Sequence, residues 1–184
     1  MSVFTNSASG AKDSAAQYVQ AIFDLLGDKE PLEVLQQTPE RLAEVIKDTR
    51  LETILEPEEP GKWSIGEVIR HLADSELVWG YRIRSVMAED KPALVGYDQD
   101  KWASRLKYSD SDPMDALHLF QALRKTHLQM LAGMTEADLA RTAIHVERGE
   151  ESIALMIKLY AGHDLAHLRQ INRILAKFGD KTSA

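Results

Sequence analysis

The sequence predicts an all-α protein, a single four-helix bundle with short accessory helices. Apolar residues recur at helical spacing in four long stretches, and residues typical of helix caps flank those stretches. A chain of 184 residues is also long enough to bury one sizeable core. We expect a flexible N-terminus at residues 1–12 and one bundle domain at residues 13–180.

The long helices are expected at residues 13–26, 64–87, 112–133 and 152–178. Thr38 and Pro39 look like an N-cap and a first helical position, so a short accessory helix is expected from there to about Lys47. The acidic stretch at residues 56–61, with prolines near both ends, is typical of a solvated linker. Between the later helices we expect a long loop at residues 91–108, a capped turn at 135–138 and a short extended segment at 141–146.

The second long helix has the clearest start signal. Ser64 can cap it, and Glu67 can return the hydrogen bond three residues later. Asp112 and Pro113 open the third helix in a similar way, and Gly179 ends the last one.

Composition excludes several functional classes. The net charge is −7, with 29 acidic and 22 basic residues, and no Lys/Arg cluster is longer than two, so we expect no nucleic-acid partner. No apolar run approaches the roughly 18 residues that a membrane span needs, and no signal peptide is expected. The absence of cysteine excludes disulfides, thiolate catalysis and Cys-based metal sites. We therefore expect a cytoplasmic protein that acts on a small molecule.

The strongest functional signal is the pair His163 and His167. Residues four apart on a helix lie on one face, so both rings can bind one metal ion at about 2.0–2.1 Å. Both also fall within the apolar stripe of the last helix, and two core histidines satisfied by hydrogen bonds are the alternative. A shared cation would satisfy both rings at once.

The spacing of the remaining histidines leaves the third ligand open. His71 lies at the edge of the apolar stripe of its helix, and His127 lies near the centre of another stripe, so the two are equal candidates. The zincin pattern fits poorly, because no His or Glu follows His167. A di-iron site also fits poorly, because it needs Glu-x-x-His on two helices. A mononuclear site fits better.

Carboxylates near these histidines are candidates for proton transfer. Glu67 lies one turn before His71 and could orient that ring or act as a base, and its alternative role is the helix cap. Asp164 could hydrogen-bond an imidazole or lie on the helix surface. Glu76 falls near the apolar side of its helix, which predicts a buried carboxylate with an arginine partner. In the long loop, further candidates to line the mouth of a pocket are Tyr97, Asp98 and Trp102.

These motifs together resemble a known family. The segment Trp63-Ser-Ile-Gly-Glu-Val-Ile-Arg-His-Leu-Ala-Asp-Ser75, followed far downstream by His163-x-x-x-His167, is similar to the DinB/YfiT-like superfamily of metalloenzymes. The segments Tyr97-Asp-Gln-Asp-Lys-Trp102 and Met134-Thr-Glu-Ala-Asp-Leu139 resemble its YfiT-type branch. The likeness spans about residues 60 to 175.

The resemblance implies a four-helix bundle with a three-histidine site for zinc or nickel. The positions of this sequence that match the family's ligands are His71, His163 and His167. The resemblance therefore favours His71 over His127 as the third ligand. The branch is often dimeric, so a homodimer is expected. Characterised members include S-transferases that use bacillithiol or mycothiol, and a mycothiol-dependent maleylpyruvate isomerase. Many others are named only as metal-dependent hydrolases.

The resemblance therefore implies a metal-dependent transferase or hydrolase. A low-molecular-weight thiol would be the co-substrate of the transferase. The alternative is a non-catalytic module that binds metal or serves as a partner in a stress response.

Overall fold

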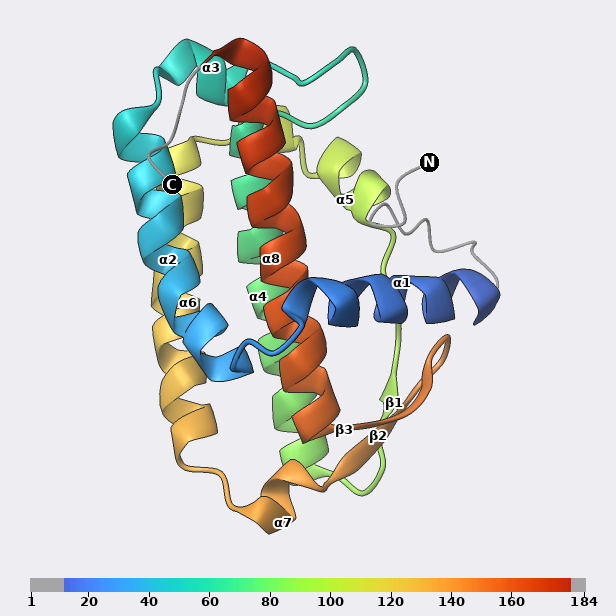
Figure 1. Cartoon of the computed structure of the whole chain (residues 1–184). Coiled ribbons are helices and arrows are strands. Elements are labelled where there is room, and N and C mark those ends of the chain that lie inside the picture. Colours follow the sequence, from blue (N-terminus) through green and yellow to red (C-terminus); the bar gives the residue numbers. More distant parts are fainter. Residues whose placement is uncertain (1–11, 180–184) are drawn as a thin grey trace.

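Four long helices form the body of the molecule in this computed structural model, which describes residues 12–179 (Figure 1). They are α2 (Pro31–Asp48), α4 (Ile65–Ala88), α6 (Pro113–Ala132) and α8 (Ile153–Phe178). In the bundle, α2 and α4 each contact both α6 and α8. The predicted four-helix bundle is thus confirmed. Within the described range, no helix combines the length and apolar character needed to cross a membrane.

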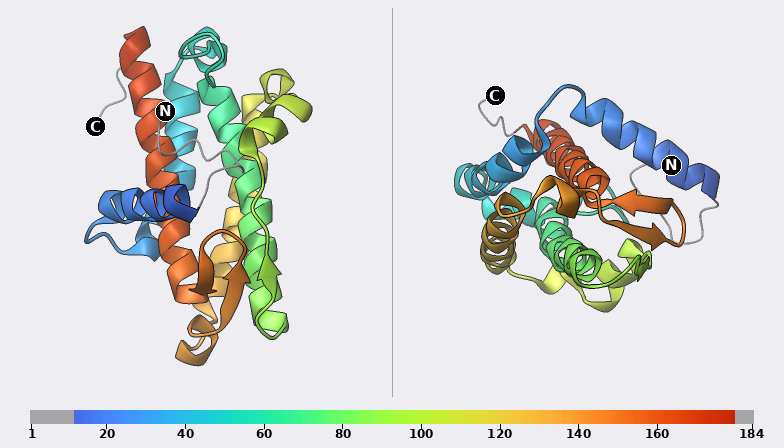
Figure 2. Two further views of the ribbon diagram at one scale, coloured as in Figure 1. Left: turned by 90° about the vertical axis from the view of Figure 1, so that its right-hand side faces the viewer. Right: turned by 90° about the horizontal axis from the view of Figure 1, so that it is seen from below.

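The four helices do not simply alternate in direction. α4 and α6 run side by side in the same direction, and so do α2 and α8 (Figures 1 and 2). The chain between α4 and α6 must therefore return along the length of the bundle. This connection contains β1 (Ala93–Leu94), α5 (Gln99–Arg105) and the 3-10 turn η1 (Tyr108–Asp110).

The N-terminal part differs from the prediction. α1 (Lys12–Leu26) packs across the outside of α8 and is not a member of the bundle (Figure 2). Its place is taken by α2, which begins at Pro31 and runs through Pro39. Apart from Lys12, where α1 starts, the segment expected to be flexible lies outside the described residues.

Pro39 is tolerated inside α2 because another donor replaces the N–H group that proline lacks. A proline in a helix leaves the carbonyl four residues earlier without its usual N–H. Here that carbonyl belongs to Leu35, and Arg124 Nη1 donates to it at 2.7 Å. The prediction that a helix starts at Thr38 was wrong for this reason: the compensating donor is 85 positions downstream of Pro39.

The remaining short elements lie at the ends and along one side of the bundle. α3 (Leu51–Leu55) follows α2, and α7 (Glu136–Leu139) occupies the predicted capped turn. The predicted extended segment is β2 (Thr142–His145), which pairs with β1 in parallel and with β3 (Gly149–Ser152) in antiparallel. The expected loop at residues 91–108 is partly helical, because Asp98 caps α5 by accepting from Lys101 N at 3.0 Å.

α4 begins as predicted. Ser64 Oγ accepts from Glu67 N at 3.2 Å, and Glu67 Oε2 accepts from Ser64 N at 2.8 Å, so both halves of the capping box are formed. α8 ends at Gly179, whose φ of 78° lies in the left-handed region that glycine adopts without strain.

A polar layer divides the core. One apolar cluster includes Trp79, Leu131 and Ile153 at one end of the bundle, and another includes Leu72, Phe120 and Ile171 at the other end. Between these levels, α4, α6 and α8 bury polar side chains, namely His71, Glu76, Arg124, His127, His163, Asp164 and His167. The candidate site is built into this layer.

Candidate metal centre

Three buried imidazoles converge where α4 faces α8. Nε2 of His163 lies 3.2 Å from Nε2 of His71 and 3.2 Å from Nε2 of His167. One ligand nitrogen from each ring lies within 4.8 Å of the other two. The helical spacing of His163 and His167 sets one side of this cluster, and the packing of α4 against α8, which run in opposite directions (Figure 1), brings in His71.

Burial keeps all three rings neutral. It lowers the pKa of His71 and His163 well below the ordinary value, and the neighbouring imidazoles lower both further. Burial also lowers the pKa of His167 to about 4, opposed only by its hydrogen bond to Gln170. Neutral imidazoles are the form that binds metal, because each ring nitrogen without a proton offers a lone pair.

The cluster fits a divalent cation better than it fits mutual hydrogen bonds. An imidazole nitrogen has one lone pair or one proton, so three Nε2 atoms cannot satisfy both short contacts well. Two nitrogens that bind one tetrahedral ion at about 2.0–2.1 Å lie about 3.3–3.4 Å apart, close to the observed 3.2 Å. All-nitrogen ligation by histidine suits zinc and nickel alike.

The groups around the cluster orient two of its rings. Gln170 Oε1 can only accept, so the 2.9 Å contact places the proton of His167 on Nδ1 and its lone pair on Nε2. Ser75 Oγ lies 3.4 Å from His71 Nε2 and 2.9 Å from the hydroxyl of Tyr97. By contrast, Nδ1 of His71 and Nδ1 of His163 are buried and have no hydrogen-bond partner in the described part of the chain.

Both carboxylates that the sequence suggested for proton transfer are engaged elsewhere. Glu67 caps α4 through the two hydrogen bonds of the capping box, which is the alternative role expected for it. Asp164 accepts from Arg124 Nη1 at 2.8 Å and from Nη2 at 3.1 Å. It is fully buried and does not lie on the helix surface.

Arg124 of α6 forms ion pairs with two buried carboxylates, Glu76 on α4 and Asp164 on α8. Its Nε donates to Glu76 Oε1 at 2.6 Å, which confirms the buried carboxylate with an arginine partner expected at that position. His127 contacts the other oxygen of Glu76, at 2.7 Å, and belongs to this network. It is not part of the cluster formed by His71, His163 and His167.

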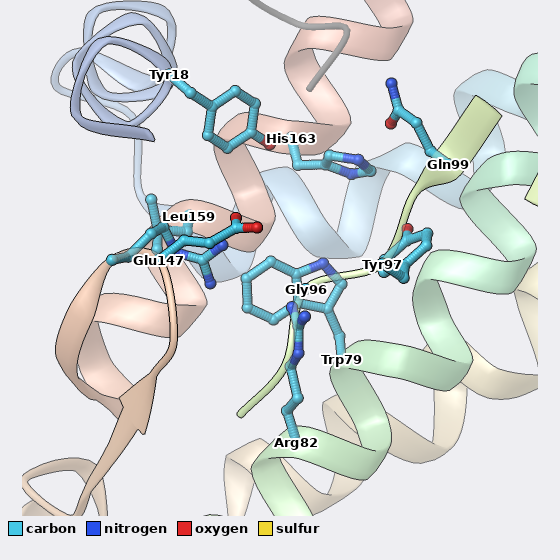
Figure 3. Close-up of a pocket in the computed structure, with 10 residues that line it drawn as sticks. Tyr18, Trp79, Arg82, Gly96, Tyr97, Gln99, Glu147, Leu159 and His163 are labelled. Atoms are coloured by element: carbon cyan, nitrogen blue, oxygen red, sulfur yellow. The ribbon is translucent and has the colours of Figure 1, made fainter. Parts of the chain in front are cut away.

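A pocket opens beside the cluster, and His163 forms part of its wall (Figure 3). Its walls come from α1, α4, α8, the connection after β1 and the turn between β2 and β3. The lining residues are Tyr18, Trp79, Arg82, Gly96, Tyr97, Gln99, Glu147, Arg148, Leu159 and His163. Of the expected loop residues, Tyr97 lines this pocket, Trp102 packs on the ring of Tyr97 at 4.6 Å and Asp98 caps α5.

Comparison with known proteins identifies the family. The sequence model of the DinB superfamily matches residues 35–171, which contain all three histidines. The chain belongs to the DinB superfamily. This confirms the family that the motifs resemble, and the match begins within α2, the helix that completes the bundle.

Relatives within the DinB superfamily carry a common name. A protein of Bacillus mycoides, named "Putative metal-dependent hydrolase", is 31% identical over 159 residues, which are 85% of this chain and 90% of the relative. A protein of the same name from Oceanobacillus iheyensis is 30% identical over 141 residues, 76% of this chain and 81% of the relative.

The fold has also been seen before. The structure of YfiT from Bacillus subtilis, described as "a probable metal-dependent hydrolase with an unusual four-helix bundle topology", superimposes with a TM-score of 0.76 at 24% identity. The superposition covers 82% of this chain and 87% of that one. At this identity the likeness concerns the fold.

The sequence predicted an arginine partner for Glu76 but did not single out Arg124, or the buried Arg82. Arg124 follows Phe120 by four residues and precedes His127 by three, so it stands on the apolar stripe of α6. Arg82 stands on the stripe of α4 in the same way, three residues after Trp79. A basic residue at a stripe position was the available signal, because a guanidinium is rarely buried unless it meets an anion.

Proposed function

We propose that this chain is a metal-dependent enzyme in which His71, His163 and His167 hold one divalent ion and a hydrolytic reaction takes place in the adjoining pocket. The observation that carries the proposal is the convergence of three neutral, buried Nε2 atoms at 3.2 Å beside a pocket. The common name of the relatives supports hydrolysis. Three protein ligands leave a position for water or substrate, as in catalytic rather than structural sites.

Two residues have a defined task in this proposal, Gln170 beside the cluster and Glu147 in the pocket. A bound zinc or nickel ion would lower the pKa of a water ligand toward 7, or hold a thiol as its thiolate. Gln170 fixes the tautomer of His167 through Nδ1. Glu147 lines the pocket and has no ion-pair partner within residues 12–179, so we assign its carboxylate as the proton acceptor in hydrolysis.

Transfer of a low-molecular-weight thiol is a second candidate, because one observation favours it. The two carboxylates nearest the histidines in sequence, Glu67 and Asp164, are held by the helix cap and by Arg124. A metal-held thiol is deprotonated without a neighbouring base, whereas attack by water gains from one. With no cysteine in the chain, the thiol would come from a small molecule.

Metal content tests the ligand set. We expect about one zinc or nickel per chain in the purified protein and loss of that metal in His71→Ala and His163→Ala. The matched control is His118→Ala, since His118 is exposed on α6 and should leave the stoichiometry unchanged. Full metal content in either ligand variant would remove that residue from the proposed set.

The reaction is tested on the metal-loaded protein with a panel of esters, amides and electrophiles, each with and without an added thiol. Hydrolysis predicts turnover without the thiol and a large loss of kcat in Glu147→Gln. Thiol transfer predicts turnover only with the thiol and little effect of Glu147→Gln. Metal binding with no turnover across the panel would instead favour the non-catalytic module.

A further inference from the structure

Arg82 has binding capacity that the fold leaves unused. It extends from α4 into the pocket beside Trp79, and only 6% of its surface is exposed (Figure 3). Its guanidinium donates to Val95 O at 2.5 Å and lies 5.6 Å from the centre of the Trp79 ring. No carboxylate within residues 12–179 forms an ion pair with it, although a guanidinium has five N–H donors. Glu147 and Glu151 act on it only through space, and a buried charge without a directly bonded opposite charge is costly.

The other cation of the pocket is already neutralised. Arg148 forms a two-point ion pair with the buried carboxylate of Glu151. His145 Nδ1 accepts from the backbone N–H groups of Glu147 and Arg148, at 3.2 and 3.4 Å, and so holds the turn that carries them. Burial first, and the charge of Arg148 second, lower the pKa of Arg82, and the smaller opposing effects of Tyr97, Glu151 and Glu147 do not cancel them. Both effects disfavour the charged guanidinium, and an anion in the pocket would offset them.

The rest of the wall combines an apolar part with polar groups from Gln99, Glu147 and Arg148. Tyr18, Trp79, Tyr97 and Leu159 contribute two phenol rings, an indole and an isobutyl group, while His163 joins the pocket to the histidine cluster. A ligand with an apolar body can pack against these rings and the leucine side chain. One guanidinium without an ion pair, facing a pocket that also contains Glu147, matches a singly charged anion better than a doubly charged phosphate.

We propose that Arg82 binds the carboxylate of the substrate, a small organic acid with an apolar body, and so places the rest of that molecule beside His163. The planar fork of a guanidinium matches a carboxylate through two parallel hydrogen bonds. The inference rests on the proposed function only for the reaction that follows. Binding of the anion itself requires Arg82 and the apolar walls.

The test is binding of benzoate, with benzamide as the neutral analogue of the same shape, to the full-length protein loaded with zinc. Isothermal titration calorimetry gives the affinities, and the indole N–H signal of Trp79 in a nitrogen-15 spectrum reports where the ligand lies. We expect benzoate to bind roughly tenfold or more tightly than benzamide. Arg82→Met should lose roughly tenfold or more in benzoate affinity, and Arg82→Lys should fall between it and the unchanged protein.

Two further variants guard against loss of folding. Glu147→Gln removes a like charge and should strengthen benzoate binding, so the two substitutions change the affinity in opposite directions. Arg84→Gln removes the same charge from an exposed side chain on the same helix and should leave the affinity unchanged. Equal affinities for benzoate and benzamide, or full benzoate affinity in Arg82→Met, would overturn the proposal.

Binding directly to the metal is the competing outcome. It predicts that benzoate binding is lost when zinc is removed by a chelator and is unaffected by Arg82→Met, and that result would also overturn the proposal. Since affinity is measured without turnover, an inactive protein that binds benzoate through Arg82 would refute the enzyme and leave the anion site standing.

Discussion

Two buried arginines show how differently one side chain is used in this bundle. Arg124 is fully buried, and its N–H groups donate to Glu76, to Asp164 and to the Leu35 carbonyl. Arg82 is nearly as deeply buried, yet within the described structure its one hydrogen bond goes to a backbone carbonyl. The fold satisfies the first guanidinium and leaves the second to a ligand. Removal of Arg124 should therefore damage the fold, and removal of Arg82 should damage binding.

The largest effect is expected for Arg124→Met. The substitution leaves Glu76 and Asp164 buried without their cation, and breaking one partner out of a buried ion pair costs about 3–5 kcal/mol. It also removes the donor that the Leu35 carbonyl needs opposite Pro39. Urea unfolding of the metal-free protein, followed by circular dichroism, measures the change in free energy of unfolding.

The control for this prediction removes the three buried charges of the network together. Glu76→Gln with Arg124→Met and Asp164→Asn should recover part of the loss, because no uncompensated charge remains buried. An unfolding midpoint of Arg124→Met equal to that of the unchanged protein would show that the network does not support the bundle.

The next largest effect is that of pH on the stability of the metal-free protein, because burial lowers the pKa of His167. The pKa of His167 is about 4 in the folded protein, below the ordinary value of about 6.5 for an unfolded chain. The unfolded state therefore binds the proton first. The stability from this group is fully present above about pH 6.5 and is lost as the pH falls toward 4, by about 3 kcal/mol.

Urea unfolding at pH 7.0 and pH 4.5, in the presence of a chelator, measures this loss. His167→Gln should show a smaller loss than the unchanged protein, because the buried ring is gone. His118→Gln should behave like the unchanged protein, since His118 is exposed. Equal pH dependence in all three proteins would mean that protonation of His167 does not limit stability.

A third prediction concerns how closely α4 and α6 approach around Glu76. A Cβ at position 80 would lie 2.2 Å from Nε2 of His127, so Gly80→Ala must push that ring away from Glu76. Overpacking of this kind costs about 1–3 kcal/mol. Gly133→Ala is the matched control, because its Cβ would meet only Met130 O at 3.7 Å. Similar unfolding energies for the two variants would contradict the tight packing.

The same contrast explains what the sequence could predict. The start of α4 and the pairing of His163 with His167 depend on residues three or four positions apart, so local spacing was enough. The place of His71 in the cluster depends on packing across 92 positions, and only family resemblance selected it over His127. Periodicity cannot show which helices are neighbours.

The misplaced start of α2 and the missed arginines have one physical cause. Pro39 marks a helix start unless a distant donor takes over the carbonyl that it leaves free, and Arg124 does so from α6. Arg82 and Arg124 both occupy apolar stripe positions, where a charge is explained only by its partners in three dimensions. The spacing of residues along the sequence does not show polar contacts between distant positions.

The smallest effect on stability is expected for Arg82→Met, the direct counterpart of Arg124→Met. Since Arg82 forms no ion pair in the part of the chain that the structure describes, an apolar side chain of similar length should change the free energy of unfolding by no more than about 1 kcal/mol. An increase in the free energy of unfolding would be the clearest result. It would mean that Arg82 destabilises the fold, as residues needed for function often do. A loss of about 3 kcal/mol or more in urea unfolding would place Arg82 with Arg124 as a structural residue and end the distinction between them.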